Sequence, residues 1–189
     1  AYLWHHPLFA FARHAHEIAL EYTEVLTGPE GRKRFPSYQQ VSEHDHRWNH
    51  TLILRHLMNA VRTRERSILV SYCRDLAERR FQQGFQSREV CDALRELNRI
   101  VYKRLLRDPE AAGMKADLYE HVTMTLTWGC DEAQQVFEHL EAAEKLADGK
   151  PGMRWVRNAL LNMSRRREEL KERLMAEAQR LAEKPARDE

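Results

Sequence analysis

Glycine, proline and long apolar runs are scarce in this chain of 189 residues. Only 7 glycines and 6 prolines are present, too few turn residues for a fold of many short strands. No stretch approaches the roughly 18 consecutive apolar residues of a membrane-spanning helix. The 31 basic and 29 acidic residues leave a net charge of +2, so no strongly basic field attracts nucleic acid. We therefore expect a protein that binds neither a membrane nor nucleic acid.

Cysteine pairs and enzyme signatures are also missing. Cys73, Cys91 and Cys130 form no CxxC and no even-numbered framework, which favours a reducing cytoplasm over secretion. The sequence contains no GxSxG, P-loop, GxGxxG or HExxH motif, so we expect no enzymatic activity. A dyad of Cys91 with His121 or His139 stays open, although nothing in the sequence brings these residues together.

Helical periodicity is what the chain does have. Hydrophobic residues make up 42% and charged residues 32%, a balance typical of amphipathic helices with charged outer faces. The stretch from Arg64 to Arg107 holds two apolar stripes of three-four spacing, joined through Gly84 and Ser87. Gly84 is expected to end the first helix with left-handed dihedrals, and Ser87 to cap the second. This segment predicts a helical hairpin at the centre of an all-α domain.

Further helices are expected on both sides of the hairpin. One covers residues 2–27, and a loop follows over 28–37. The segment 38–62 is helical, as one helix or two, with Ser42 or Asp45 as its cap. A long helix covers about 115–146, in which Gly129 permits close packing or marks a kink. The sequence thus predicts a globin-like or irregular bundle of five to six helices over 1–148, followed by a long C-terminal helix.

That C-terminal helix, expected over 153–184, has a different pattern. Its apolar residues alternate three and four apart, interrupted at Arg167 and Glu177, and the stretch RRREELKER is almost entirely charged. A seam of two positions in seven is too narrow to bury itself and is typical of a coiled coil. We therefore predict a homodimer whose seam is formed by Met153, Val156, Leu160, Met163, Leu170, Leu174 and Leu181.

The hairpin carries a family resemblance. From Ala77 to Arg99 the chain reads AERRFQQGFQSREVCDALRELNR, with a basic pair, an aromatic, the helix-ending Gly84 and the acidic Glu89. This pattern, within about residues 51–144, resembles the N-terminal sensory domains of the RsbR/RsbRD type. The resemblance implies a globin-like all-α dimer without haem, placed ahead of an output domain in a bacterial stress-response regulator. Because the chain begins at Ala1 without Met, we expect it to be a piece of a longer protein.

The 10 histidines raise the question of a metal. His46 and His50 are four residues apart and share a helical face, and Glu43 adds an ExxH pairing with His46. Together with His44 they are candidate ligands of one divalent ion. The remaining elements of a di-iron or hemerythrin-like site are missing, so the alternative is a set of surface or helix-start histidines.

Haem is the second cofactor that a globin-like fold brings into question. An axial ligand requires a histidine on an inward helical face. His56 shares its face with Leu52 and Ile53, and His121 shares one with Leu118, so these two are the haem candidates. The alternative is that both are hydrogen-bonded core residues, and we expect no cofactor.

The prediction for function follows from these elements. We expect a non-enzymatic, cytoplasmic sensory domain that dimerises and relays a signal through its C-terminal helix to an output domain or partner signalling protein. The alternatives are a haem- or metal-binding helical protein that uses inward histidines, and a purely structural interaction module.

Overall fold

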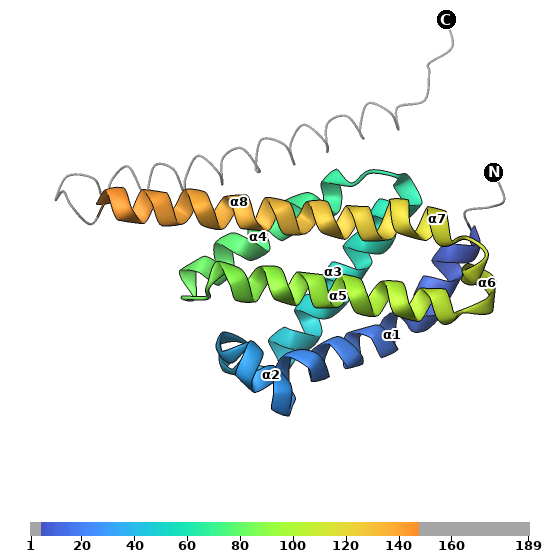
Figure 1. The fold of residues 1–189 in the computed structure, drawn as a ribbon, viewed down its shortest axis with the longest axis horizontal. Helices are drawn as coiled ribbons and strands as arrows, with labels where there is room; N and C mark the ends of the chain where they lie inside the picture. Colours follow the sequence, from blue (N-terminus) through green and yellow to red (C-terminus); the bar gives the residue numbers. More distant parts are fainter. Residues whose placement is uncertain (1–4, 148–189) are drawn as a thin grey trace, which may run out of the picture. The chain divides into compact units, whose positions relative to one another are not determined.

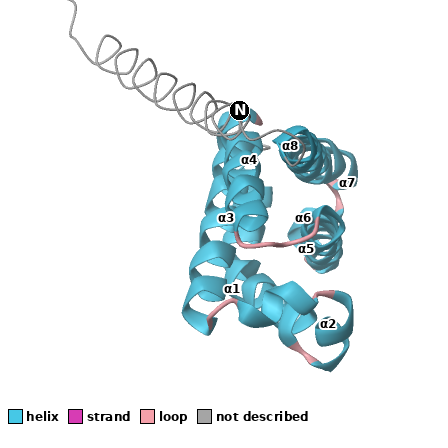
Figure 2. Cartoon of the chain, turned by 90° about the vertical axis from the view of Figure 1, so that its left-hand side faces the viewer, coloured by secondary structure: helices cyan, strands magenta, loops and turns pink. Residues whose placement is uncertain are grey.

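Every regular element of the described part of the protein is a helix. In the computed structural model, residues 5–147 are described, and no strand is found among them, which confirms the predicted all-α class (Figures 1 and 2). In chain order the elements are α1 (His5–Thr27), α2 (Pro29–Arg34), the 3₁₀ turn η2 (Pro36–Gln40), α3 (Glu43–Thr63), α4 (Ser67–Gln82), α5 (Ser87–Arg107), α6 (Pro109–Ala112), α7 (Lys115–Leu118), the π-helical turn η3 (Tyr119–Thr123) and α8 (Met124–Ala147).

The chain divides into two compact units between Glu138 and His139. The first unit contains α1 to α7 and most of α8, and it carries the core and the site described below. The predicted helix over 153–184 lies outside the described residues, and so do all seven predicted seam residues.

The core of the first unit lies between helices that are distant in sequence. Helix α1 packs against both α3 and α5, and α3 packs against α4. Figure 2 shows α3 and α4 side by side, with α5 nearly end-on beside them. The apolar stripes predicted from the sequence are the faces that become buried, because each helix removes its stripe from water against a neighbour. The fully buried large side chains include Ile18, Leu26, Leu57, Leu69, Leu94, Leu97 and Ile100.

The predicted hairpin is present as α4 and α5. Gly84 has φ +81, the left-handed conformation that a glycine adopts without a Cβ clash, so its predicted role in ending α4 is confirmed. The prediction for Ser87 was wrong by one residue. Ser87 is the first residue of α5, and Gln86 occupies the cap position without a side-chain hydrogen bond to the helix.

The predicted loop over 28–37 was also wrong, because it contains α2 and η2. Pro29 and Pro36 each stand in the first turn of their element, where a proline fixes φ near the helical value and needs no N–H partner. Gly31 brings α2 against α1: a Cβ there would lie 2.4 Å from the Val25 carbonyl oxygen. Two prolines taken as loop markers are therefore helix starts.

The segment after this turn is a single α-helix. Ser42 caps α3, since its hydroxyl accepts a hydrogen bond from the Asp45 N–H at 3.1 Å, which settles the choice between the two expected caps. The helix ends at Thr63, where Arg64 adopts φ 60.

The long helix predicted from residue 115 is present with one interruption. It runs as α7, η3 and α8, so a π-helical turn over Tyr119–Thr123 is inserted near its start. Gly129 permits close packing, as predicted: a Cβ there would lie 2.7 Å from Sγ of Cys73 on α4.

Candidate functional site

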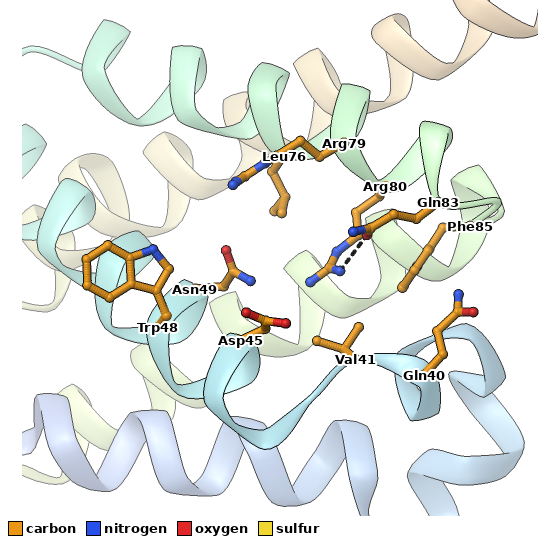
Figure 3. Close-up of a pocket in the computed structure, with 10 residues that line it drawn as sticks. All are labelled: Gln40, Val41, Asp45, Trp48, Asn49, Leu76, Arg79, Arg80, Gln83 and Phe85. Carbon is orange, nitrogen blue, oxygen red and sulfur yellow. Dashed lines mark hydrogen bonds between the residues drawn. The ribbon is translucent and has the colours of Figure 1, made fainter.

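A hollow of about 440 Å³ lies between the first turns of α3 and the end of α4 (Figure 3). Its volume is within the range of small-molecule sites in proteins. Both apolar and polar side chains line it, from η2, α3, α4 and the segments that follow η2 and α4. The lining residues are Gln40, Val41, Asp45, Trp48, Asn49, Leu76, Arg79, Arg80, Gln83 and Phe85.

Arg80 is the unusual member of this lining. Arg80 is charged but only 5% exposed. It lies on the same face of α4 as the core residues Leu76 and Ala77. Nη1 donates to Oε1 of Gln83 at 2.9 Å, and Nε is buried without a hydrogen-bond partner. Within residues 5–147, no carboxylate pairs with this guanidinium. A buried charge without a counter-ion is costly, so Arg80 marks the hollow as a site.

Two aromatic rings hold the Arg80 guanidinium in place. Its Cζ lies 5.3 Å from the ring centroid of Tyr38 and 4.7 Å from that of Phe85. Phe85 reaches this position because Gly84 reverses the chain, and the Phe85 N–H then donates to the Arg80 carbonyl at 3.0 Å. The helix-ending glycine therefore also builds the site.

Tyr38 is fixed from the other side by Glu89 of α5. The Glu89 carboxylate, in a residue 7% exposed, accepts from the Ser37 N–H at 2.9 Å and from the Ser37 hydroxyl at 2.5 Å. These bonds tie η2 to the first turn of α5, where a negative charge is also favoured by the helix dipole. Burial raises the pKa of Tyr38, which keeps the ring neutral against Arg80. The Glu89 carboxylate therefore already has its hydrogen-bond partners within the protein.

The opposite wall of the hollow comes from the first turns of α3. Figure 3 shows the Asn49 amide directed toward the Arg80 guanidinium across the hollow, and Oδ1 of Asn49 is buried without a hydrogen-bond partner. Asp45 lies at the edge with its carboxylate accepting from the Ser42 hydroxyl at 2.8 Å. Trp48, 60% exposed, extends the rim into solvent.

His46 and His50 lie beneath this wall, in the core. They are 2% and 4% exposed, so neither is a surface histidine; His46 does lie at the start of α3, as the helix-start alternative had it, and His44 is exposed. The face of α3 that they share is covered by Tyr22 and Tyr38, whose rings contact those of His50 and His46.

The hydrogen bonds of the two rings define their protonation. Nε2 of His46 lies 3.1 Å from the Tyr38 carbonyl oxygen, which can only accept, so Nε2 carries the proton. Nδ1 of His50 lies 2.8 Å from the Thr23 hydroxyl, whose own proton goes to the Ala19 carbonyl, so Nδ1 of His50 is the donor. Burial lowers the pKa of both, that of His50 to about 3, with the charge of Arg80 contributing.

The candidate metal ligands do not converge in this structure. The Glu43 carboxylate is exposed and pairs with Arg47 at 2.9 Å, while the rings of His46 and His50 point into the core, 5.3 Å apart between centroids. Among the residues that the structure describes, no group of three His, Cys, Asp or Glu side chains is arranged to hold a metal ion.

The two haem candidates lie at separate places. The ring of His56 on α3 lies against Tyr72, with 4.9 Å between centroids. His121 belongs to η3 and lines a second hollow of about 430 Å³ beside the turn from α3 to α4, together with Arg66 and Trp128. Burial lowers the pKa of both histidines, so both are neutral at physiological pH.

All three cysteines are buried with free thiols. The neighbour of Cys91 is Cys130 on α8, whose Sγ lies 3.6 Å from the Cys91 carbonyl oxygen. The interaction between the two neighbouring thiols lowers the pKa of Cys91 and raises that of Cys130, because only one of them ionises readily. Burial raises the pKa of Cys73 to about 12.

Sequence reasoning missed Arg80 as a site residue. A signal was present: Arg80 follows Leu76 by four residues and Ala77 by three, so the apolar stripe of α4 continues through a charged position. The sequence could not show that Tyr38 and Phe85 would enclose it.

Comparison with known proteins gives the class of this domain. The model of the RsbT co-antagonist protein RsbRD N-terminal domain matches residues 29–150. No curated protein and no solved structure gave a match. The chain is therefore a domain of a stress-response signalling regulator.

More particularly, the chain belongs to the RsbRD N-terminal domain family, as the resemblance of the hairpin indicated. The matched region begins at Pro29, so it includes α2 and η2 and every element that lines the Arg80 hollow. No helix among residues 5–147 is both long and apolar enough to cross a membrane.

Proposed function

We propose that this domain is the non-enzymatic input module of a stress-response regulator, which dimerises through its C-terminal helix and passes a signal along that helix. The receiver is an output domain or a partner signalling protein. Free thiols at all three cysteines agree with a reducing, cytoplasmic setting. Membership of the RsbRD N-terminal domain family supports the regulatory role.

The observation that carries the dimer is the spacing of the C-terminal apolar residues. From Met153 to Leu181 they follow a register of alternating three- and four-residue steps, in which Arg167 and Glu177 take two of the positions, and the stretch RRREELKER within it is almost entirely charged. Such a strip buries too little surface to hold a helix alone and becomes stable when an identical strip packs against it. A paired helix of this kind transmits a small rotation or shift in register over its length.

The test is the mass of the protein in solution. Size-exclusion chromatography with multi-angle light scattering compares the intact chain with one truncated after Asp148. We expect a dimer for the intact chain and a monomer for the truncated one, because the truncation removes the whole seam. A monomeric intact chain at high concentration would contradict the proposal.

Point variants separate the seam from the rest of the helix. Leu160→Glu with Leu174→Glu places two charges in the seam and is expected to give a monomer. Asn158→Glu with Gln179→Glu adds the same charge at positions opposite the seam and is expected to leave the dimer intact.

A further inference from the structure

We propose that the Arg80 hollow binds a small organic monocarboxylate, whose carboxylate pairs with the Arg80 guanidinium and whose aliphatic body occupies the space beside it. The inference rests on the proposed function only for the consequence of binding, namely that the bound acid is the signal. Binding itself is measured without reference to dimerisation.

The charge of Arg80 is the first reason. Arg80 is 5% exposed, and its guanidinium is enclosed by Tyr38, Phe85 and its own helix. Its one hydrogen bond goes to the neutral amide of Gln83. Removing a cation from water without supplying an anion is unfavourable, and an entering anion corrects this. Figure 3 shows the guanidinium directed into the hollow, where such an anion would meet it.

The nearby acidic residues do not fill this role. Glu89, the carboxylate whose charge acts on Tyr38 together with that of Arg80, already accepts two hydrogen bonds from Ser37. Asp45 lies at the rim and accepts from Ser42. A planar carboxylate that enters from solvent matches the fork of guanidinium donors better than any side chain within residues 5–147 does.

The charge of the lining favours a monoanion over a phosphate dianion. Arg80 is the buried cation of the hollow, whereas Arg79 is exposed to solvent at its edge. Asp45 lines the same space, so a second negative charge on the ligand would be repelled rather than neutralised. One unit of negative charge is therefore the amount that the site balances.

The remaining walls define the body of the ligand. Val41, Leu76 and Phe85 give the hollow an apolar side next to Arg80. The volume of about 440 Å³ accommodates a carboxylic acid with a short aliphatic chain of a few carbon atoms. Each methylene that reaches these walls adds to the affinity through its burial.

Calorimetric titration of the intact chain with three probes tests the ligand class. Butyrate is expected to bind saturably, and butanol, which has the same body without the charge, is expected not to bind. Inorganic phosphate is expected to bind more weakly than butyrate. Tighter binding of phosphate, equal binding of butanol, or no saturable binding of butyrate would each overturn the assignment.

Variants test whether Arg80 is the anchor. Arg80→Met keeps the bulk and removes the charge, and it is expected to weaken butyrate binding about tenfold or more, the usual effect of losing a charged hydrogen bond. Arg88→Met removes an arginine whose side chain is 89% exposed and is expected to bind like the unchanged protein. Unchanged affinity in Arg80→Met would overturn the proposal.

Thermal unfolding distinguishes a ligand anchor from a structural residue. Without butyrate, Arg80→Met is expected to unfold at the same or a higher temperature than the unchanged protein, because an unpaired buried charge is replaced by an apolar group. Butyrate is expected to raise the midpoint of the unchanged protein alone. A large fall in the midpoint of Arg80→Met would show that Arg80 is needed for folding and would contradict its role as an unpaired anchor.

A second variant keeps the charge and fills the space. Val41→Phe leaves Arg80 in place but occupies the hollow from its apolar side, and it is expected to abolish butyrate binding. Retained binding would contradict the location. The seam variant with Leu160→Glu and Leu174→Glu is expected to bind butyrate normally, so failure of the dimer and failure of the ligand site are separate results.

Discussion

The positive charge of Arg80 disfavours protonation of the buried His50 ring. Burial is the main cause that lowers the pKa of His50 to about 3, and repulsion from Arg80, and from His46 when that ring is protonated, lowers it further. The positive charge at the hollow thus helps to keep the two core histidines neutral. An anion bound to Arg80 would weaken this effect without removing the burial that dominates it.

The low pKa of His50 predicts a pH-dependent stability. The folded ring titrates near pH 3, below its ordinary value of 6.5, so the unfolded chain binds the additional proton between these values. The contribution of His50 to the free energy of unfolding is therefore complete above about pH 6.5. It falls by about 1.4 kcal/mol per pH unit as the pH decreases toward 3. Urea denaturation at a series of pH values measures this slope.

Matched histidine variants assign the slope. His50→Gln is expected to flatten it, with a remainder from His46, whose pKa is also lowered by burial. His44→Gln changes an exposed ring and is expected to leave the slope unchanged. An identical slope in His50→Gln and the unchanged protein would show that His50 is not the titrating group.

Local sequence rules succeeded at single residues where the effect is itself local. Ser42 caps α3 and Gly84 ends α4 because each role depends on a few neighbouring backbone groups. The burial of His46, His50 and Arg80 was not predictable in this way. It depends on Tyr22, Tyr38 and Phe85, which approach from other elements.

At the scale of elements, the packing of α4 against α8 depends on Gly129. A Cβ there would lie 2.7 Å from Sγ of the fully buried Cys73, closer than atoms in contact are found. Gly129→Ala is expected to lower the stability by about 1–3 kcal/mol, because the cost of overpacking exceeds the gain in helix propensity.

A double-mutant cycle isolates this contact. Cys73→Ala removes the Sγ atom, and the nearest remaining atom of residue 73 would be its Cβ at 3.5 Å, an ordinary contact distance. In the Cys73→Ala background, Gly129→Ala is therefore expected to be neutral or stabilising. Chemical denaturation measures both effects, and equal losses in the two backgrounds would contradict the close packing.

A helix was predictable from the sequence where its apolar stripe is long enough to show a helical period. The hairpin of α4 and α5 has long stripes and was placed correctly. Helix α2 has six residues and η2 has five, so both are too short for a periodic signal. Their prolines were taken as loop markers. The π-helical turn η3 inserts within a continuous stripe and leaves no sequence signal.

At the scale of the whole molecule, the two proposals together connect the Arg80 hollow with the C-terminal helix. Helix α3 gives one wall of the hollow and packs on α4, which contacts α8 through Cys73 and Gly129. Helix α8 extends to Ala147, and the predicted seam begins at Met153. Under the two proposals, this contiguous path of packed helices is the route along which occupancy of the hollow would act on α8.

Distances between two spin labels, one on each copy of the intact chain at Gln179→Cys, test this account most directly. In the predicted heptad register, position 179 is opposite the predicted seam, and the native cysteines are buried, so the unmutated chain under the same labelling conditions is the control. The account predicts a defined distance between copies that changes on addition of butyrate, and no change in Arg80→Met. The absence of any dipolar coupling between copies, or a distance that butyrate leaves unaltered, would contradict it.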